Sequence, residues 1–172
     1  MSVLLNEGVY RHLHFGVPMS RVYSYSVMTW PHSLAITGDL GGAMFRMNDK
    51  DVLGSFQLPG HISYFYWGEK AISAGTGRVY SFDATKVSEY VLLYHGDQLG
   101  DEADAVVEDI DMWMTPEEAS AELALLPIPD IDIGEAMNAG QVLSIPFINQ
   151  CDAIAWAAKT WWDNVSLAED SE

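Results

Sequence analysis

The sequence predicts an α+β fold: an N-terminal antiparallel β-meander of three to four strands packed against several helices, with an acidic helical C-terminal half. Short β-branched and aromatic segments separated by turn residues fill residues 10–46. Helical periodicity replaces them from about residue 49 onwards. Strands that come first and helices that come later favour an antiparallel sheet over alternating βαβ units. The length of 172 residues suits one domain, so we expect a single domain, 1–172, comprising sheet plus helices (1–95) and an acidic helical part (96–172).

The strands are predicted from alternation and from the turns between them. Residues 11–15 and 21–29 are rich in aromatic and β-branched side chains, and residues 33–37 and 43–46 follow them. Gly or Pro lies in each connection, as expected for the turns of a meander.

The first helices are expected at about 49–58 and 61–74, and from Ser81 or Asp83 to about Leu93. The spacing of the third predicts a buried stripe of Val87, Tyr90, Val91 and Tyr94.

The most regular helical pattern covers residues 101–114. Its apolar residues fall within an arc of about 120° when each residue turns by about 100°. The opposite face and its flanks carry Asp101, Glu102, Asp104, Glu108, Asp109 and Asp111. Thr115-Pro-Glu-Glu118 then has the signature of a capping box and predicts a helix to about Leu126, which adds Glu117, Glu118 and Glu122.

The C-terminal part predicts an irregular segment or short helical turn over 130–140 and a last helix from Asn149. Trp161 and Trp162 point about 100° apart on that helix, so we expect one of them at an interface, and a homodimer stays open as an alternative. The predicted core contains Val106, Val107, Ile110, Leu123, Ile154, Ala158 and Trp161.

The formal net charge is −17, and its distribution is uneven. Residues 1–86 carry a net +1, whereas residues 87–172 carry −18 with Lys159 as their one basic residue. A chain this acidic does not bind nucleic acid directly, because phosphates are bound by Lys and Arg. An acidic surface without balancing bases favours a basic partner, and a solubilising surface is the competing interpretation.

Few residues support catalysis or cofactor binding. His12 and His14 point to the same side of a strand and could form a metal site with His32 or Asp39. Cys151 lies in an apolar helix and is expected in the core. No Gly-x-Ser-x-Gly elbow and no phosphate-binding loop is present. The sequence therefore predicts no catalytic residue, no cofactor and no metal, and favours a binding protein over an enzyme.

Several segments resemble a family of uncharacterised phage and prophage proteins. They are His12-Leu-His-Phe15, Thr29-Trp-Pro-His-Ser-Leu34, Gly38-Asp-Leu-Gly41, Tyr66-Trp-Gly-Glu-Lys70 and Tyr80-Ser-Phe-Asp83, which together cover about residues 10–95. The family pattern has Pro-Gly-His where this sequence has Pro31-His32-Ser33. The resemblance implies a phage origin and no defined activity.

These observations predict a phage-encoded interaction protein that inhibits a basic host protein, either a defence effector or a nucleic-acid-binding protein. Asp101, Asp104, Glu108 and Asp111 would span about 15 Å of helix and resemble the phosphates of one DNA strand. The alternative is a small enzyme or metal-binding protein that uses His12, His14 and Asp39. We expect the cytoplasm of the bacterial host as its location, because the N-terminus has no secretory signal and no segment is apolar enough for a membrane helix.

Overall fold

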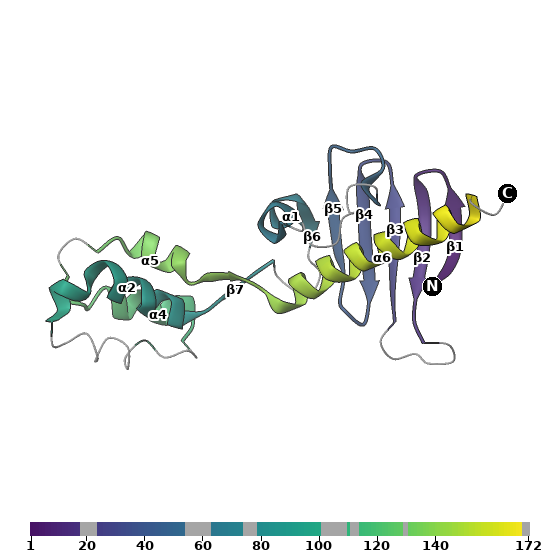
Figure 1. Cartoon of the computed structure of the whole chain (residues 1–172). Coiled ribbons are helices and arrows are strands. Elements are labelled where there is room, and N and C mark those ends of the chain that lie inside the picture. The colour runs from purple at the N-terminus through teal and green to yellow at the C-terminus, as the bar shows by residue number, and fades with distance from the viewer. Residues whose placement is uncertain are drawn as a thin grey trace. The chain divides into compact units, whose positions relative to one another are not determined.

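The computed structural model describes residues 1–17, 24–53, 63–73, 79–100, 110, 114–128 and 131–169, with side chains up to residue 164 (Figure 1). The α+β class is confirmed, with a six-stranded antiparallel meander and five helices in the described part of the chain. The chain forms two compact units. Unit 1 comprises Met1–Val79 and Leu143–Glu172, and unit 2 comprises Tyr80–Val142. Unit 2 is thus an insertion between two segments of unit 1, whereas the sequence predicted an internal division after residue 95.

The sheet of unit 1 has its strands in chain order, and each pairs with the next in antiparallel fashion. The strands are β1 (Ser2–Glu7), β2 (Tyr10–Phe15), β3 (Tyr25–Trp30), β4 (Ser33–Gly38), β5 (Ala43–Arg46) and β6 (Ala71–Ser73). The four predicted strands correspond to β2–β5. The prediction of three to four strands missed both edges of the sheet.

The two edge strands escaped prediction for different reasons. β1 is exposed along its whole length and carries a register shift between Val3 and Leu5, so its sequence lacks the alternation of a half-buried strand. β6 lies within the helix predicted over 61–74. In the structure α1 (Tyr64–Lys70) ends at Lys70, and the chain pairs at once with β5. Part of the helix predicted over 49–58 lies outside the described residues; Val52 and Leu53 of that segment are buried.

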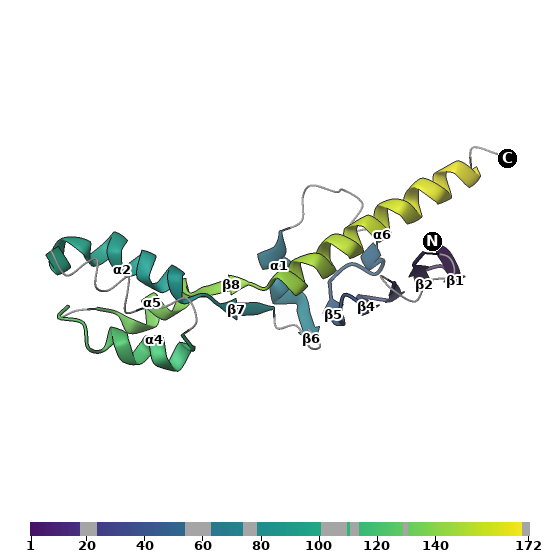
Figure 2. The same cartoon turned by 90° about the horizontal axis from the view of Figure 1, so that it is seen from below.

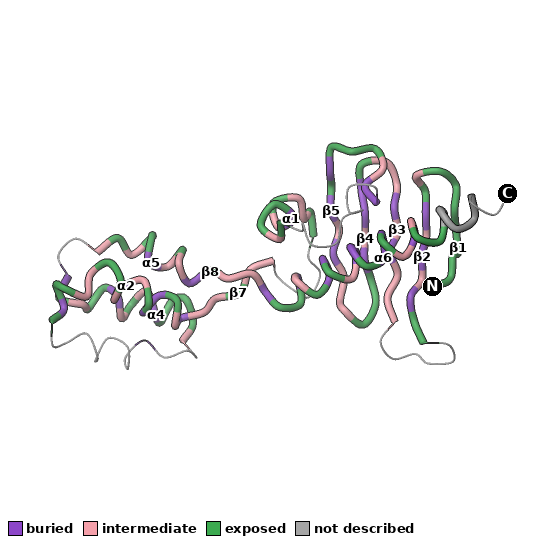
Figure 3. Tube along the Cα trace, viewed as in Figure 1, coloured by how far each residue is buried: buried purple, intermediate pink, exposed green. Residues whose placement is uncertain are grey.

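One face of the sheet forms the core of unit 1. Leu13, Val27, Ile36 and Ala43 are aligned across β2–β5 and are all buried. Figure 3 shows the alternation of buried residues along these strands. Half-exposed side chains such as His12 and Met28 lie on the opposite face. Figure 2 shows the described helices of unit 1 on one side of the strands.

The long helix α6 (Ile145–Glu169) covers the buried face (Figures 1 and 2). Phe147 packs near Phe45, with ring centroids 6.0 Å apart, and the Tyr25 hydroxyl donates to the Ala153 carbonyl at 3.3 Å. The helix begins four residues before the predicted Asn149, because the Ser144 hydroxyl accepts a hydrogen bond from the Phe147 N–H at 3.3 Å and acts as its cap.

Hydrogen bonds hold two of the turns at the ends of the sheet. His32 has φ of 63°, a backbone conformation that favours glycine. Its backbone N–H donates to the Lys50 carbonyl, and its carbonyl accepts from the Met47 N–H. At the other end of the sheet, Asp39 exchanges two hydrogen bonds with the Ser24 backbone, at 2.8 and 2.9 Å. These hydrogen bonds join the ends of strands to the neighbouring turns and segments.

Unit 2 contains three described helices and a separate core. They are α2 (Ala84–Leu99), α4 (Pro116–Leu123) and α5 (Ile133–Ala139); β7 (Tyr80–Phe82) and β8 (Gln141–Leu143) pair in a two-stranded sheet. The start of α2 at its predicted cap Asp83 is confirmed, but the helix extends six residues beyond Leu93. The segment 130–140, predicted to be irregular or a short helical turn, contains the seven-residue helix α5.

The described members of the predicted core are buried, but they belong to two clusters. Ile154, Ala158 and Trp161 pack in unit 1. Ile110 and Leu123 pack in unit 2. Val106 and Val107 lie outside the described residues.

Of the helices that the structure describes, none is both long enough and apolar enough to cross a membrane.

An ion pair between β2 and the segment after β5 is partly enclosed in unit 1. The guanidinium of Arg11 donates to both carboxylate oxygens of Asp51, at 2.8 and 2.9 Å, and lies 5.5 Å from the Trp161 ring centroid. The Arg11 side chain is 9% exposed. The carboxylate of Asp51 therefore compensates a positive charge that is nearly removed from water.

We expect Asp51→Ala to lower the free energy of unfolding by about 3 kcal/mol, because the Arg11 guanidinium would stay buried without its carboxylate. Urea denaturation followed by circular dichroism measures this cost. The double variant Arg11→Met with Asp51→Leu removes both charges and should recover most of the stability. A cost below about 0.5 kcal/mol for Asp51→Ala would contradict a structural role for the pair.

Candidate functional site: the acidic unit

Acidic residues are concentrated in unit 2. Its residues, 80–142, include fifteen of the 25 Asp and Glu and a single basic residue, Lys86. The Lys86 ammonium donates to the Glu89 carboxylate at 2.6 Å within α2. Unit 2 therefore carries −14 of the net charge of −17. The charge asymmetry between the two halves is visible in the sequence. In the structure, most of the acidic residues belong to an inserted unit that has its own core.

The predicted partner-binding residues divide into two groups. Asp101, Glu102, Asp104, Glu108, Asp109 and Asp111 lie outside the described residues. From that predicted helix the structure describes Ile110, which is 2% exposed in the core of unit 2, and the half-buried Met114. Glu117, Glu118 and Glu122 lie on α4, where the first two are exposed and the third is half-exposed.

Glu118 has a structural role at the start of α4. Its carboxylate accepts from the Thr115 backbone N–H at 2.8 Å, and the Thr115 hydroxyl accepts from the Glu118 N–H at 3.3 Å. The predicted capping box is therefore confirmed. These hydrogen bonds, the one from the Thr115 backbone above all, lower the pKa of Glu118. The helix ends at Leu123, three residues before the predicted Leu126.

Two further carboxylates start helices in the same way. Asp83 accepts from the Thr85 N–H at 3.0 Å and caps α2, and Asp132 accepts from the Glu135 N–H at 3.0 Å and caps α5. A carboxylate here satisfies an unpaired N–H group and lies at the positive end of the helix dipole. Part of the acidity of unit 2 thus stabilises its own helices.

Other acidic side chains are available to a partner. Within the described part of unit 2, Asp97, Glu117 and Glu122 make no side-chain hydrogen bond or ion pair. Asp97 lies in the last turn of α2 and Glu122 in the last turn of α4. A carboxylate at the C-terminal end of a helix is opposed by the helix dipole, so local helix stability does not account for these two acids.

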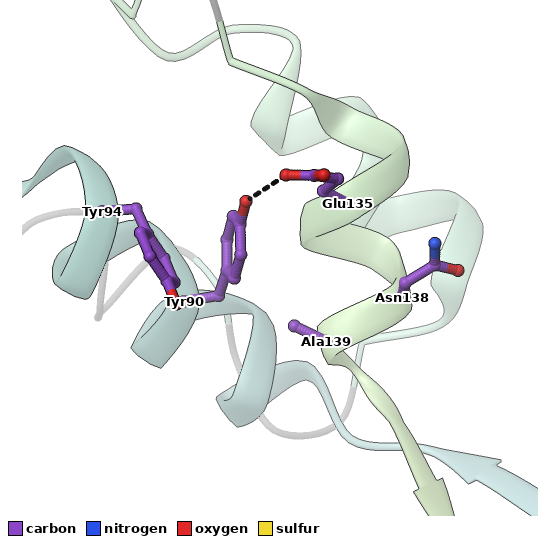
Figure 4. Close-up of a pocket in the computed structure, with 5 residues that line it drawn as sticks. All are labelled: Tyr90, Tyr94, Glu135, Asn138 and Ala139. Atoms are coloured by element: carbon purple, nitrogen blue, oxygen red, sulfur yellow. Dashed lines mark hydrogen bonds between the residues drawn. The ribbon is translucent and has the colours of Figure 1, made fainter.

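An open pocket of about 530 Å³ lies between α2 and α5 (Figure 4). It is lined by Tyr90, Tyr94, Glu135, Asn138 and Ala139. The Tyr90 hydroxyl donates to Glu135 Oε2 at 2.9 Å, and this hydrogen bond to a carboxylate raises the pKa of Tyr90.

Of the four residues predicted to form the buried stripe of α2, two are buried. Val87 and Val91 are buried, whereas Tyr90 is half-exposed and Tyr94 is 64% exposed at the pocket.

The alternative site on the sheet gains no support from the geometry. The His14 Nδ1 lies 3.0 Å from the Ser26 hydroxyl, and the Asp39 carboxylate is bonded to the Ser24 backbone. Within the described ranges, no three His, Cys, Asp or Glu side chains come together in a group that could hold a metal ion.

Cys151 is fully buried, as predicted, and burial raises the pKa of its thiol to about 12. A thiol with such a pKa is almost entirely protonated at neutral pH and is a poor nucleophile.

The expected interface tryptophan is not Trp161, which is buried at 6% exposure. Trp162 is half-exposed. Trp156, on the same helix, is 54% exposed and packs edge-on against Phe15, with ring centroids 5.2 Å apart.

Comparison with protein-family models, with curated proteins and with solved structures gave no match.

The capping box gives a test of which acids are structural. We expect Thr115→Ala to lower the free energy of unfolding by about 1 kcal/mol, because the Glu118 N–H loses its acceptor.

Glu118→Ala should also destabilise the protein at neutral pH. Since the pKa of Glu118 is lowered in the folded state, its contribution is complete above its ordinary pKa and is lost as the pH falls through the folded value. Thermal unfolding from neutral to acidic pH measures both effects.

Glu117→Ala is the matched control, because Glu117 is the adjacent exposed acid of the same helix turn. We expect a smaller cost for it than for Glu118→Ala. Equal costs at neutral pH would show that the capping box adds nothing to the general attraction between an acid and the helix N-terminus.

Proposed function

We propose that this chain is a phage-encoded interaction protein that binds a basic host protein through the acidic surface of unit 2 and occupies the site where nucleic acid would bind. The observation that carries the proposal is the segregation of charge. Fifteen acids and one lysine occupy an inserted unit with its own hydrophobic cluster, and that lysine is paired within its own helix.

The cost of this arrangement supports a binding role. Like charges on neighbouring helix turns repel one another and reduce stability, and a solvated helical surface ordinarily mixes both signs. Capping explains Asp83, Glu118 and Asp132, but it does not explain Asp97 and Glu122 at helix C-terminal turns. A basic partner would neutralise such carboxylates and recover the repulsive energy on binding.

The chemistry of the partner follows from the sign and density of the charge. A groove built for DNA presents Lys and Arg to a polyanion, and its field attracts an acidic surface from a distance. Unit 1 differs, since it holds seven of the eight Lys and Arg against ten acids. We therefore assign partner binding to unit 2 and a supporting role to unit 1. The phage origin rests on the sequence resemblance alone.

Charge reversal at the two helix C-terminal turns tests the proposal. We expect Asp97→Lys with Glu122→Lys to weaken partner binding about tenfold or more at low salt, because attraction is replaced by repulsion. Folding should not suffer, since Lys is favoured at a helix C-terminus. The full chain is immobilised, proteins retained from a bacterial lysate are eluted in a salt gradient, and the dissociation constant of the purified partner is then measured.

The matched control is Glu7→Lys with Glu69→Lys, which changes the net charge equally but on exposed positions of unit 1. It should bind the partner like the wild type, and duplex DNA should compete for the partner. Equal binding by the wild type and both variants would refute the acidic surface of unit 2 as the interface. A partner that duplex DNA fails to displace would refute occupation of a nucleic-acid site.

A further inference from the structure

We infer that the open pocket between α2 and α5 binds a guanidinium group, supplied by an arginine side chain of the basic partner. The inference rests on the proposed function and names the chemical group that the acidic unit recognises at one position. Two tyrosine rings and one carboxylate, all within unit 2, supply the complementary chemistry.

The aromatic part consists of Tyr90 and Tyr94, which lie one turn apart on α2. Their ring centroids are 4.7 Å apart, with an interplanar angle of 41°. Tyr94 is 64% exposed, and in Figure 4 Tyr90 lies between it and α5. A cation placed within about 6 Å of a ring centroid is attracted by the negative face of the ring. The exposed Tyr94 ring offers such a face at the mouth of the pocket.

The anionic part is the Glu135 carboxylate. Its Oε2 accepts the Tyr90 hydroxyl at 2.9 Å, while Oε1 makes no hydrogen bond to a described residue. The Asp132 cap holds the backbone N–H of Glu135, and the Tyr90 hydroxyl holds its carboxylate, so the residue is oriented before a ligand arrives. Asn138 borders the pocket, but its amide points away from the rings (Figure 4).

The surroundings favour a cation over an anion. Lys86, the one basic residue of unit 2, lies one turn before Tyr90 and is paired with Glu89. An anionic ligand would meet the Glu135 charge without compensation. Arginine fits better than lysine, because a planar guanidinium can stack on a tyrosine ring while its N–H groups bond a carboxylate.

The test uses the full chain and a fluorescein-labelled Gly-Arg-Gly-Arg-Gly peptide, with the lysine and citrulline versions for comparison. Fluorescence anisotropy at low salt should rank arginine above lysine and lysine above the uncharged citrulline. We expect Tyr94→Ala and Glu135→Gln each to weaken arginine-peptide binding about fivefold, and Tyr94→Phe to bind like the wild type because the ring face remains.

Glu117→Gln is the matched control for Glu135→Gln, since it removes the same charge from an exposed position of unit 2 outside the pocket. It should change the affinity less than about twofold. If Tyr94→Ala has no effect, or if Glu117→Gln and Glu135→Gln weaken binding equally, the pocket is refuted and the general acidic surface remains. If the citrulline peptide binds as well as the arginine peptide, neither the pocket nor the acidic surface selects a basic partner, and both proposals are overturned.

Discussion

The main physical constraint on unit 2 is the mutual repulsion of its carboxylates. The unit holds fifteen acids with one lysine, so the Lys86–Glu89 pair is the one ion pair with a lysine that its own residues can supply to its helices. Three of the acids offset part of this repulsion by capping helix N-termini, where the backbone itself supplies the opposite partial charge. A separate apolar cluster that includes Val87, Ile110 and Leu123 supplies the packing that holds the helices together.

Unit 1 is held together by a conventional apolar core. A meander sheet buries one face under a single long helix, and its few charges are close to balance. Among the described residues of unit 1, Arg11 carries the one nearly buried charge, which contacts the Asp51 carboxylate and the Trp161 ring. The acidic segment between Val79 and Leu143 has an apolar cluster of its own, separate from the core of the sheet.

The parts that sequence reasoning predicted are those with local signals. Strands β2, β3 and β5 largely alternate between buried and more exposed residues, and the Thr115 capping box is formed by four consecutive residues. The edge strand β1 has no alternation to detect, and β6 exists because pairing with β5 overrides a helical pattern. The pocket was missed because Tyr90 and Glu135 are 45 residues apart and are brought together only by the packing of α2 on α5. The charge asymmetry was visible in the sequence, but the limits of the inserted unit depend on long-range contacts.

The central claim is that partner binding is confined to the acidic inserted unit. Amide hydrogen exchange of the full chain, with and without the purified partner, tests it most directly because it reports on both units in one experiment. We expect slower amide exchange in α2, α4 and α5 when the partner is bound, and unchanged exchange in β2–β5 and α6. Protection of the sheet, with no change in the three helices of unit 2, would contradict it.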